Sequence, residues 1–285
     1  MNCFHIIHYP LSIIHYPLKM LLAIDIGNTN ISFGVFDGEN LIAHWRMATV
    51  RSRTLDETGV LARQMFSISE IDYKKISAVI ISSVVPQLDS SIRRMSEKYF
   101  GLEAIIVDST FDFGLKIKYN PPSSVGIDRV VAASAAVHKY GKPCIVCDFG
   151  TATTIDAVNE HGEYLGGTIA PGMNVLADAL FEKTSRLPKV EIKKVETVIG
   201  TSTVHSIQAG IYFGYAGLVD GIVRRMIVEL GEKPKVIATG GLAALVTESS
   251  ELIEIIDETL MLEGLRLVYQ KIREAKNSER KMTNI

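Results

Sequence analysis

The stretch LLAIDIGNTN, residues 21–30, decides the fold of this 285-residue chain. Its first four residues are wholly apolar, which predicts a short strand buried on both faces of a sheet. The polar part, Asp25 to Asn30, leads into an alternating apolar stretch at 31–36. Asp37-Gly38 is typical of a hairpin turn, and residues 41–46 form a third expected strand. The sequence therefore predicts a three-stranded meander with a polar turn between its first two strands.

The same order of elements occurs a second time, with Asp148 lying 123 residues after Asp25. Residues 144–147 (CIVC) are apolar and precede the polar segment Asp148-Phe149-Gly150-Thr151-Ala152-Thr153. Strand-like segments follow at 154–158 and 164–167. Solenoid repeats have periods of ~20–50 residues, so a repeat of this length indicates a duplicated domain.

Helix-like and strand-like segments alternate in the remainder of each half. We expect helices at 54–66, 87–99, 130–138, 203–230 and 242–246, and strands at 78–84, 104–107 and 235–239. This alternation predicts an α/β fold whose sheets are covered on both faces. Gly141 and Pro143 interrupt a helix just before the second repeat. We therefore divide the chain there into two domains, residues 20–140 and 141–285.

Residues 1–19 differ from the rest of the chain. The sequence IIHYPL occurs at 6–11 and again at 13–18, and each copy contains a helix-breaking proline. The basic start, unbroken apolar core and small-residue cleavage site of a signal peptide are missing. We expect this segment to be a disordered or artefactual extension ahead of a start at Met20.

The composition is that of a globular protein, with 47% hydrophobic and 22% charged residues. The formal net charge of −2 gives no electrostatic footprint for a nucleic acid or an anionic membrane. No uncharged apolar run reaches the ~18 residues of a membrane span. Three cysteines exclude a disulfide framework and fit a reducing compartment. We therefore expect a cytoplasmic protein with neither a nucleic acid nor a membrane as partner.

The two Asp-x-Gly turns have the composition of a phosphate-binding site. A tight turn that contains glycine points several backbone N–H groups into one concavity, which suits phosphate oxygens. Asp25 and Asp148, at the strand ends, are then placed to hold the cation that accompanies a polyphosphate. One such motif would be read as an ordinary turn, but two copies in matching contexts favour two turns that hold ATP between them. A third glycine-rich turn, Thr239-Gly240-Gly241, is expected beside the ribose or α-phosphate.

Three motifs together give the chain a family resemblance: Asp25–Asn30, Gly126-Ile127-Asp128-Arg129 and Asp148–Thr151. From Met20 to about Lys271 the chain resembles type III pantothenate kinases, within the actin-like ATPase and sugar kinase superfamily. The resemblance implies duplicated actin-like (ribonuclease H-like) domains, each with a mixed sheet, and an ATP cleft between them. It implies ATP-dependent phosphorylation of pantothenate to 4′-phosphopantothenate, the first step of coenzyme A biosynthesis. Magnesium would accompany ATP, and a monovalent cation, potassium or ammonium, would also bind.

The resemblance also implies roles for individual residues. Asp128 would be the general base, since an aspartate with an ordinary pKa of ~3.9 is ionised at neutral pH. Asp148 would bind the monovalent cation. The residues expected to bind ATP are Asp25, Ile26, Gly27, Asn28, Thr29, Asn30, Ile31, Ser32 and Thr151. Those expected to bind pantothenate are Tyr119, Gly126, Ile127, Asp128, Arg129 and Thr203, and the fork of Arg129 suits a carboxylate.

Each assignment has a structural alternative. Asp128 and Arg129 also read as a helix N-cap followed by a surface arginine. Tyr119 could anchor a loop, Thr203 could cap a helix, and Asp148 could be a turn residue. For the whole chain, the alternatives are a kinase for another small hydroxylated acceptor and a non-catalytic transcriptional accessory factor that keeps the fold. A non-catalytic factor could lose Asp25, Asp128 or Asp148, and all three are present in this chain.

Four glycines share one face of the expected helix at 203–230, at positions 210, 214, 217 and 221. Glycine inside a helix costs ~1 kcal/mol relative to alanine, so four on one face indicate close approach of another backbone. The resemblance implies a homodimer. We therefore expect this glycine face at or beside the subunit contact, with packing inside the chain as the alternative.

Overall fold

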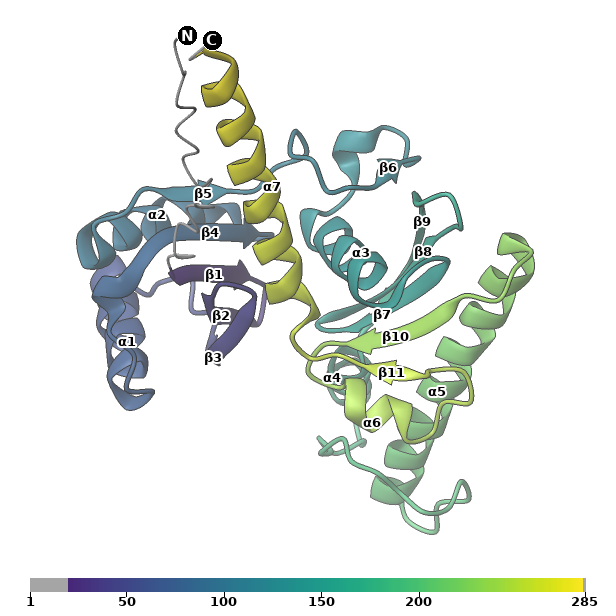
Figure 1. Ribbon diagram of the computed structural model, residues 1–285. Coiled ribbons are helices and arrows are strands. Elements are labelled where there is room, and N and C mark those ends of the chain that lie inside the picture. Colours follow the sequence, from purple (N-terminus) through teal and green to yellow (C-terminus); the bar gives the residue numbers. More distant parts are fainter. Residues whose placement is uncertain (1–19, 284–285) are drawn as a thin grey trace, which may run out of the picture.

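The computed structural model describes residues 20–283, so the extension expected at 1–19 lies outside the described residues. The chain forms two sheets, one in each half, with helices on both faces (Figure 1). The first sheet has five strands in the order β3-β2-β1-β4-β5. They are β1 (Met20–Ile26), β2 (Asn30–Asp37), β3 (Asn40–Ala48), β4 (Ile76–Ser83) and β5 (Ala104–Ile106).

The second sheet has six strands in the order β11-β10-β7-β8-β9-β6. They are β6 (Lys116–Ile117), β7 (Cys144–Phe149), β8 (Ala152–Val158), β9 (Glu163–Pro171), β10 (Lys235–Thr239) and β11 (Ile255–Ile256). In each half an antiparallel meander is joined by a later strand that runs parallel to its first strand, β4 beside β1 and β10 beside β7. The duplication predicted from the sequence is therefore confirmed as two mixed sheets of one topology.

Two helices cover the outer face of the first sheet, α1 (Leu55–Ile68) and α2 (Pro86–Phe100). Ile24, Phe33 and Ile81 lie in the apolar cluster on this side and are fully buried. Thr54 and Glu57 form a capping box at the start of α1, in which each side chain accepts a hydrogen bond from the other residue's backbone N–H.

Two further helices pack against each other between the sheets, α3 (Ile127–Tyr140) and α7 (Leu260–Thr283) (Figure 1). The apolar cluster around them joins the two halves, because it contains Leu21 from β1, Val146 from β7 and Leu265 from α7. Gly264 allows the close approach of the two helices, since a Cβ there would collide with the backbone of Val131. The N-terminal end of α3 is thereby held between the two sheets.

The other face of the second sheet is covered by α4 (Met173–Lys183), α5 (Thr203–Leu230) and α6 (Ala243–Thr247). Alternation along β7 places Cys144 on the α3 side and Cys147 on the α5 side. The C-x-x-C spacing therefore does not pair the two thiols. Burial raises the pKa of the Cys144 thiol to about 12, as expected of an unreactive core residue.

The division of the chain at residue 140 stays a prediction, and two elements cross it. β6, from the first expected domain, pairs with β9 of the second sheet, Lys116 opposite Glu163. α7, from the second expected domain, packs against β1 and β4. The inner face of the first sheet would otherwise expose Leu21 and Ile80, so the helix that buries them comes from the far end of the chain.

The glycine face of α5 has no partner within the described chain. A Cβ at Gly210, Gly214 or Gly217 would meet nothing within 4 Å, and one at Gly221 would meet only Arg225 of the same helix. Packing inside the chain, the alternative explanation for this face, is therefore wrong for the described residues.

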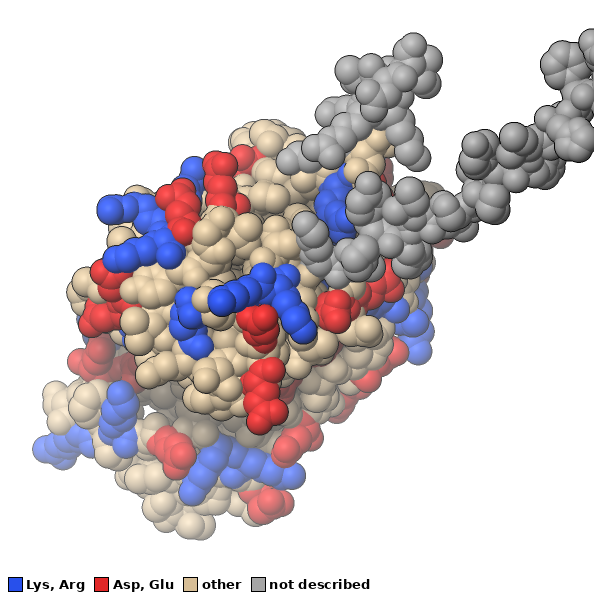
Figure 2. Space-filling model, turned by 60° about the vertical axis from the view of Figure 1, so that its left-hand side comes forward, with Lys and Arg blue, Asp and Glu red and all other residues tan. Residues whose placement is uncertain are grey.

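Charges are mixed over the face shown in Figure 2, where Lys and Arg alternate with Asp and Glu and no large area has one sign. Among residues 20–283, no helix combines the length and the apolar character that crossing a membrane would need.

Candidate active site

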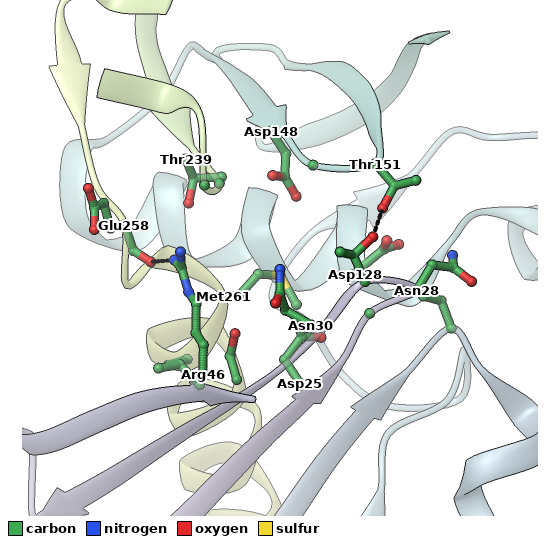
Figure 3. Close-up of a pocket in the computed structure, with 18 of the residues that line it drawn as sticks. Asp25, Asn28, Asn30, Arg46, Asp128, Asp148, Thr151, Thr239, Glu258 and Met261 are labelled. Carbon is green, nitrogen blue, oxygen red and sulfur yellow. Dashed lines mark hydrogen bonds between the residues drawn. The ribbon is translucent and has the colours of Figure 1, made fainter. Parts of the chain in front are cut away.

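A cleft opens between the two sheets, where the chain leaves β1 and β7 (Figure 3). Its volume is about 220 Å³. Both predicted phosphate turns line it, together with part of β3, the first turn of α3, the glycine-rich turn after β10 and the segment that leads into α7. The side chains on its wall include those of Asp25, Asn28, Thr29, Asn30, Ser32, His44, Arg46, Asp128, Asp148, Thr151, Thr154, Thr239, Glu258 and Met261.

The two predicted phosphate turns meet across this cleft. The first is closed by the Gly27 N–H, which donates to the Asn30 carbonyl at 2.9 Å. The second is closed by the Gly150 N–H, which donates to the Ala152 carbonyl at 3.1 Å. The Oγ1 atoms of Thr29 and Thr151 lie 2.6 Å apart and form a hydrogen bond between the turns. The structure therefore brings together two segments that the sequence separates by more than a hundred residues.

Strand register aligns a row of four side chains across each sheet, and all of them except Ser82 and Ile169 line the cleft. The first row consists of Ser82, Asp25, Ser32 and Arg46, on β4, β1, β2 and β3. The second row consists of Thr239, Asp148, Thr154 and Ile169, on β10, β7, β8 and β9. Because side chains alternate along a strand, the burial of Ile24 and Ile26 on the outer side turns Asp25 toward the cleft.

Two glycines outside the hairpins let the backbone approach the second turn. Gly240 has φ of +93°, and a Cβ there would lie 2.5 Å from Oδ1 of Asp148. A Cβ at Gly172 would lie 2.5 Å from the carbonyl oxygens of Gly150 and Thr151. The third glycine-rich turn identified in the sequence thus lies directly against Asp148.

Asp128 lies in the first turn of α3 and lines the cleft. The N-cap of this helix is Gly126, so Asp128 does not have the capping role that was its structural alternative. Its Oδ1 accepts the backbone N–H of Arg129 at 2.8 Å. A helix N-terminus favours negative charge, so the position supports an ionised carboxylate that faces the cleft.

Three carboxyl groups in the cleft have a raised pKa, and burial is the main cause for each. Burial, with the charges of Asp128 and Asp148, raises the pKa of Asp25 to about 7. Burial, with the charges of Asp128 and Asp156, raises the pKa of Asp148 to about 6. Burial also raises the pKa of Asp128, although the backbone N–H and the charge of Arg129 oppose the shift. A cation between these groups would relieve their repulsion.

The donor set of the cleft fits hard cations, which take oxygen ligands. Among residues 20–283, no three His, Cys, Asp or Glu side chains are close enough to hold a metal ion by themselves. Magnesium retains waters and takes substrate phosphates as ligands beside one or two carboxylates. Asp25 and Asp148 therefore suit a cation that arrives with a polyphosphate.

Arg129 is buried against the second sheet and is only 7% exposed. Its Nε and Nη2 donate to Oδ1 of Asp156 at 3.1 and 2.6 Å, and the hydroxyl of Tyr164 donates to the same oxygen at 2.6 Å. Burial lowers the pKa of Arg129, but the hydrogen bond and charge of Asp156 outweigh this effect and raise it above its usual range. The surface-arginine alternative is therefore wrong. Only the N–H groups that Asp156 leaves unoccupied are available to a ligand.

Tyr119 lies beside this ion pair, with its ring centroid 5.8 Å from the guanidinium carbon of Arg129. Gly166 has φ of +103°, and a Cβ there would lie 3.0 Å from the Tyr119 ring. The structure thus brings Tyr119 next to Arg129 of the Gly126–Arg129 segment, and the resemblance implies that both bind pantothenate. Asp156 was missed, although an aspartate in an otherwise apolar strand was a usable signal.

Seven predicted site residues do not line the cleft: Ile26, Ile31, Tyr119, Gly126, Ile127, Arg129 and Thr203. Ile26 and Ile31 are buried in the core of the first sheet, so only their backbone can serve the first turn. Thr203 begins α5, on the opposite face of the second sheet from α3, and does not line the cleft. Its helix-cap alternative is also wrong, because the N-cap is Ser202.

The cleft also contains residues that sequence reasoning did not single out. Arg46, Thr154 and Glu258 all line it. For Arg46 the available signal was alternation, since it follows the half-buried Trp45 in an expected strand and must point to the other face. Glu258 lies in the connection before α7, and no local pattern indicates that this connection returns to the cleft.

Comparison with known proteins agrees with this geometry. Residues 21–225 match the family model described as type III pantothenate kinase. The chain is 49% identical over 262 residues to a type III pantothenate kinase of Koribacter versatilis, covering 88% of this chain and 96% of the relative. It is 51% identical over 250 residues to one of Myxococcus xanthus, covering 88% and 98%. The chain belongs to the type III pantothenate kinase family.

Solved structures show that this member of the type III pantothenate kinase family has the expected actin-like sugar kinase fold. The inorganic polyphosphate/ATP-glucomannokinase from an Arthrobacter species superposes with a TM-score of 0.50, over 90% of this chain and 99% of that chain. The two sequences are 13% identical, so this likeness concerns the fold alone.

Proposed function

We propose that this enzyme transfers the γ-phosphoryl group of ATP to the primary hydroxyl of pantothenate, giving 4′-phosphopantothenate and ADP, the first step of coenzyme A biosynthesis. The observation that carries the proposal is the convergence of Asp25, Asp128 and Asp148 with both hairpin turns on one cleft. A transcriptional accessory factor without catalysis would not need three carboxylates facing one another at this cost in repulsion. Membership of the family favours pantothenate over other hydroxylated acceptors.

In the proposed reaction, Asp128 accepts the proton of the acceptor hydroxyl. The hydroxyl oxygen attacks the γ-phosphorus in line, and the bond between that phosphorus and the bridging oxygen of ADP breaks. The raised pKa of Asp128 brings it closer to neutrality, where a general base works best provided that it stays ionised. The position of this carboxylate in the first turn of α3 favours its ionised form.

The two hairpins would hold the outer phosphates of ATP through backbone N–H groups and through the hydroxyls of Thr29 and Thr151. Asp25 and Asp148 would hold the accompanying cations, magnesium with the phosphates and potassium or ammonium at Asp148. Bound cations would offset phosphate charge and lower the pKa of both carboxyl groups. The support for this part is the raised pKa of each carboxyl group in the cleft without a cation.

Pantothenate would lie beside Asp128, toward Tyr119 and Arg129. Asp156 already occupies two donors of Arg129, so the pantothenate carboxylate would receive at most the remaining N–H groups. Asp156 would fix the orientation of that guanidinium, and Tyr164 would hold Asp156 in place, since its hydroxyl donates to the same Oδ1 atom that accepts from Arg129. The rigid placement of Arg129 next to the catalytic Asp128 supports its role in orienting the acceptor.

We further propose a homodimer. The open glycine face of α5 would allow another backbone to approach closely, and apolar side chains are exposed nearby on α4, including Val175 and Phe181. Thr203 lies on this side of the second sheet, away from the other substrate residues of its own chain. In a dimer through this side, Thr203 would serve a pantothenate pocket close to the subunit contact.

We place the enzyme in the cytoplasm. Its described cysteines, Cys144 and Cys147, are both free and buried. Cysteines without disulfides fit a reducing compartment, where ATP is also available.

A coupled assay of ADP release with ATP, magnesium and potassium tests the activity. We expect turnover with pantothenate, a product heavier by one phosphoryl group in the mass spectrum, and little turnover with glucose, mannose or acetate. Turnover with one of these acceptors and not with pantothenate would favour a kinase for another small hydroxylated acceptor. Absence of turnover with every acceptor, while ATP still binds, would favour the accessory factor.

A further inference from the structure

The duplicated sheets allow the two halves of the cleft to be compared position by position. The rows described above read Ser82, Asp25, Ser32 and Arg46 in the first sheet and Thr239, Asp148, Thr154 and Ile169 in the second. The first three positions have the same chemistry in both halves: hydroxyl, carboxylate, hydroxyl. The fourth differs, because the first half has an arginine where the second has an isoleucine that is 65% exposed. The positive charge is therefore not a by-product of the duplicated fold.

Arg46 reaches the cleft with most of its donors unused. Its Nη2 donates to the Glu258 carbonyl oxygen at 3.5 Å, a long and weak contact (Figure 3). This is the one hydrogen bond that its side chain makes to the described residues. A guanidinium carries five N–H donors, so the arrangement leaves a charged, exposed fork on the wall of the cleft.

The surroundings of Arg46 are acidic. Asp25, Asp128, Asp148 and Glu258 line the same cleft, and Arg46 is the one Lys or Arg among the described lining residues. A polyphosphate brings several negative charges into this lining. Arginine pairs with phosphate oxygens through two parallel hydrogen bonds, which makes Arg46 the side chain on the wall best suited to that group.

The position of Arg46 indicates which phosphates it reaches. Its Nη1 lies 3.8 Å from the place that a Cβ on Gly241 would occupy. The Gly240-Gly241 turn is the segment expected beside the ribose and α-phosphate, whereas the hairpins enclose the outer phosphates. Arg46 also lies two strands away from Asp25 across the sheet, roughly 10 Å by the usual strand spacing. It is therefore placed at the nucleoside end of the phosphate chain.

We propose that Arg46 is a catalytic residue that binds the α- and β-phosphate oxygens of the nucleotide. During transfer, the bond from the γ-phosphorus to the bridging oxygen breaks, and the electron pair stays on the β-phosphate of the departing ADP. A guanidinium at that phosphate stabilises the charge as it develops. The catalytic part of this inference rests on the proposed function. The nucleotide-binding part does not depend on the identity of the acceptor.

The test uses Arg46→Gln, the charge-preserving Arg46→Lys and a control, Arg93→Gln, on the exposed outer face of α2. Calorimetric titration of the full chain with ADP, in magnesium and potassium, measures binding without an acceptor. We expect Arg46→Gln to raise the Kd for ADP at least tenfold, Arg46→Lys to recover part of the loss, and Arg93→Gln to match the wild type. In the kinase assay, Arg46→Gln should lower kcat/KM for ATP about 100-fold and change KM for pantothenate less than threefold.

Two results would overturn the inference. One is a change in the Kd for ADP of less than tenfold in Arg46→Gln. The other is a rise in KM for pantothenate as large as the loss in ADP binding, which would mean that Arg46 acts by arranging the two halves through Glu258. If the wild type binds ADP but does not phosphorylate pantothenate, the proposed function fails, and the ADP titration still decides the role of Arg46.

Discussion

The hydroxyls of Thr29 and Thr151 are hydrogen-bonded to each other, with 2.6 Å between their oxygens, although the residues lie 122 positions apart in the chain. Each belongs to the turn of one of the two duplicated meanders. The polar tips of the two turns therefore satisfy each other across the cleft. Phosphate oxygens entering between them would replace a neutral hydrogen bond with charge-assisted ones, which are about twice as strong.

Asp128→Asn is expected to abolish phosphoryl transfer while leaving nucleotide binding nearly intact. The amide keeps the size of the side chain but does not accept the proton, and a general base contributes roughly 10²- to 10⁴-fold. Turnover with pantothenate and the Kd for ADP are measured together, with the exposed Asp37→Asn as control. Retention of more than about a tenth of wild-type turnover, a barrier change below ~1.4 kcal/mol, would show that another group takes the proton.

Activity is expected to rise when potassium or ammonium replaces sodium at constant ionic strength. Asp148 lies one residue before the end of β7 and lines the cleft, and burial raises its pKa, so a bound cation would offset an unfavourable negative charge there. Asp148→Ala should lose this salt response together with most of the activity. Equal rates in the three salts would rule out a monovalent cation at this position.

Gly240→Ala is expected to damage the proposed cation site at Asp148, whereas Gly141→Ala should affect stability alone. Both glycines have positive φ, +93° and +84°, so both substitutions strain the backbone by about 1–3 kcal/mol. Only the new methyl group at position 240 would lie 2.5 Å from Oδ1 of Asp148, since nothing lies within 4 Å at position 141. Thermal unfolding measures the loss of stability that both variants share. The increase in rate with potassium measures the loss of cation binding that is expected only in Gly240→Ala. If both variants respond equally to potassium, the close approach of Gly240 to Asp148 does not matter for cation binding.

The protein without cations is expected to be less stable at pH 8 than at pH 5. A carboxyl group whose pKa is raised by folding contributes stability that is fully present below its unfolded pKa, near 3.8, and is lost as the pH rises through its folded pKa. For Asp148 and Asp25 those folded values are about 6 and about 7. Asp25→Asn should flatten the fall in Tm between pH 5 and 8. A Tm that falls equally in wild type and variant would assign the pH dependence to other groups.

Gly214→Leu is expected to weaken the proposed dimer and to raise KM for pantothenate more than KM for ATP. The added side chain would fill the open glycine face of α5, where another helix is expected to approach. Multi-angle light scattering measures the oligomeric state, and steady-state kinetics measure both KM values. A variant that stays dimeric with unchanged pantothenate kinetics would place the glycine face away from both the interface and the pocket.

Local sequence patterns predicted the elements whose causes are local. The expected helix at 54–66 is α1, which begins after the capping box at Thr54. The expected strand at 235–239 is β10. Both polar turns are in the expected places because each follows a strand with an apolar run and precedes a second strand of the same sheet. The resemblance then placed Asp25, Asp128, Asp148 and Thr151 in one cleft, where the structure has them.

Features that depend on distant contacts were not predictable in this way. Arg129 has the local context of an exposed residue in a first helical turn, and its burial follows from Asp156, 27 residues later in another element. The two-residue strand β6 exists because it lies along the edge of β9. Glu258 lines the cleft because the chain crosses between the two sheets before α7. Hydrophobic periodicity in the sequence does not indicate this crossing.

The packing of α7 links the completion of the cleft to the order of translation. Residues 260–283 are synthesised after every strand of the two sheets, yet Leu262 and Leu265 belong to the cluster that covers Leu21 and Ile80 of the first sheet. A nascent chain that ends before this helix would present one bare apolar face of that sheet, a surface that chaperones bind and that favours aggregation. Met261 and Leu262 also form part of the cleft wall, so a ribosome-bound intermediate has no complete cleft until α7 has been made.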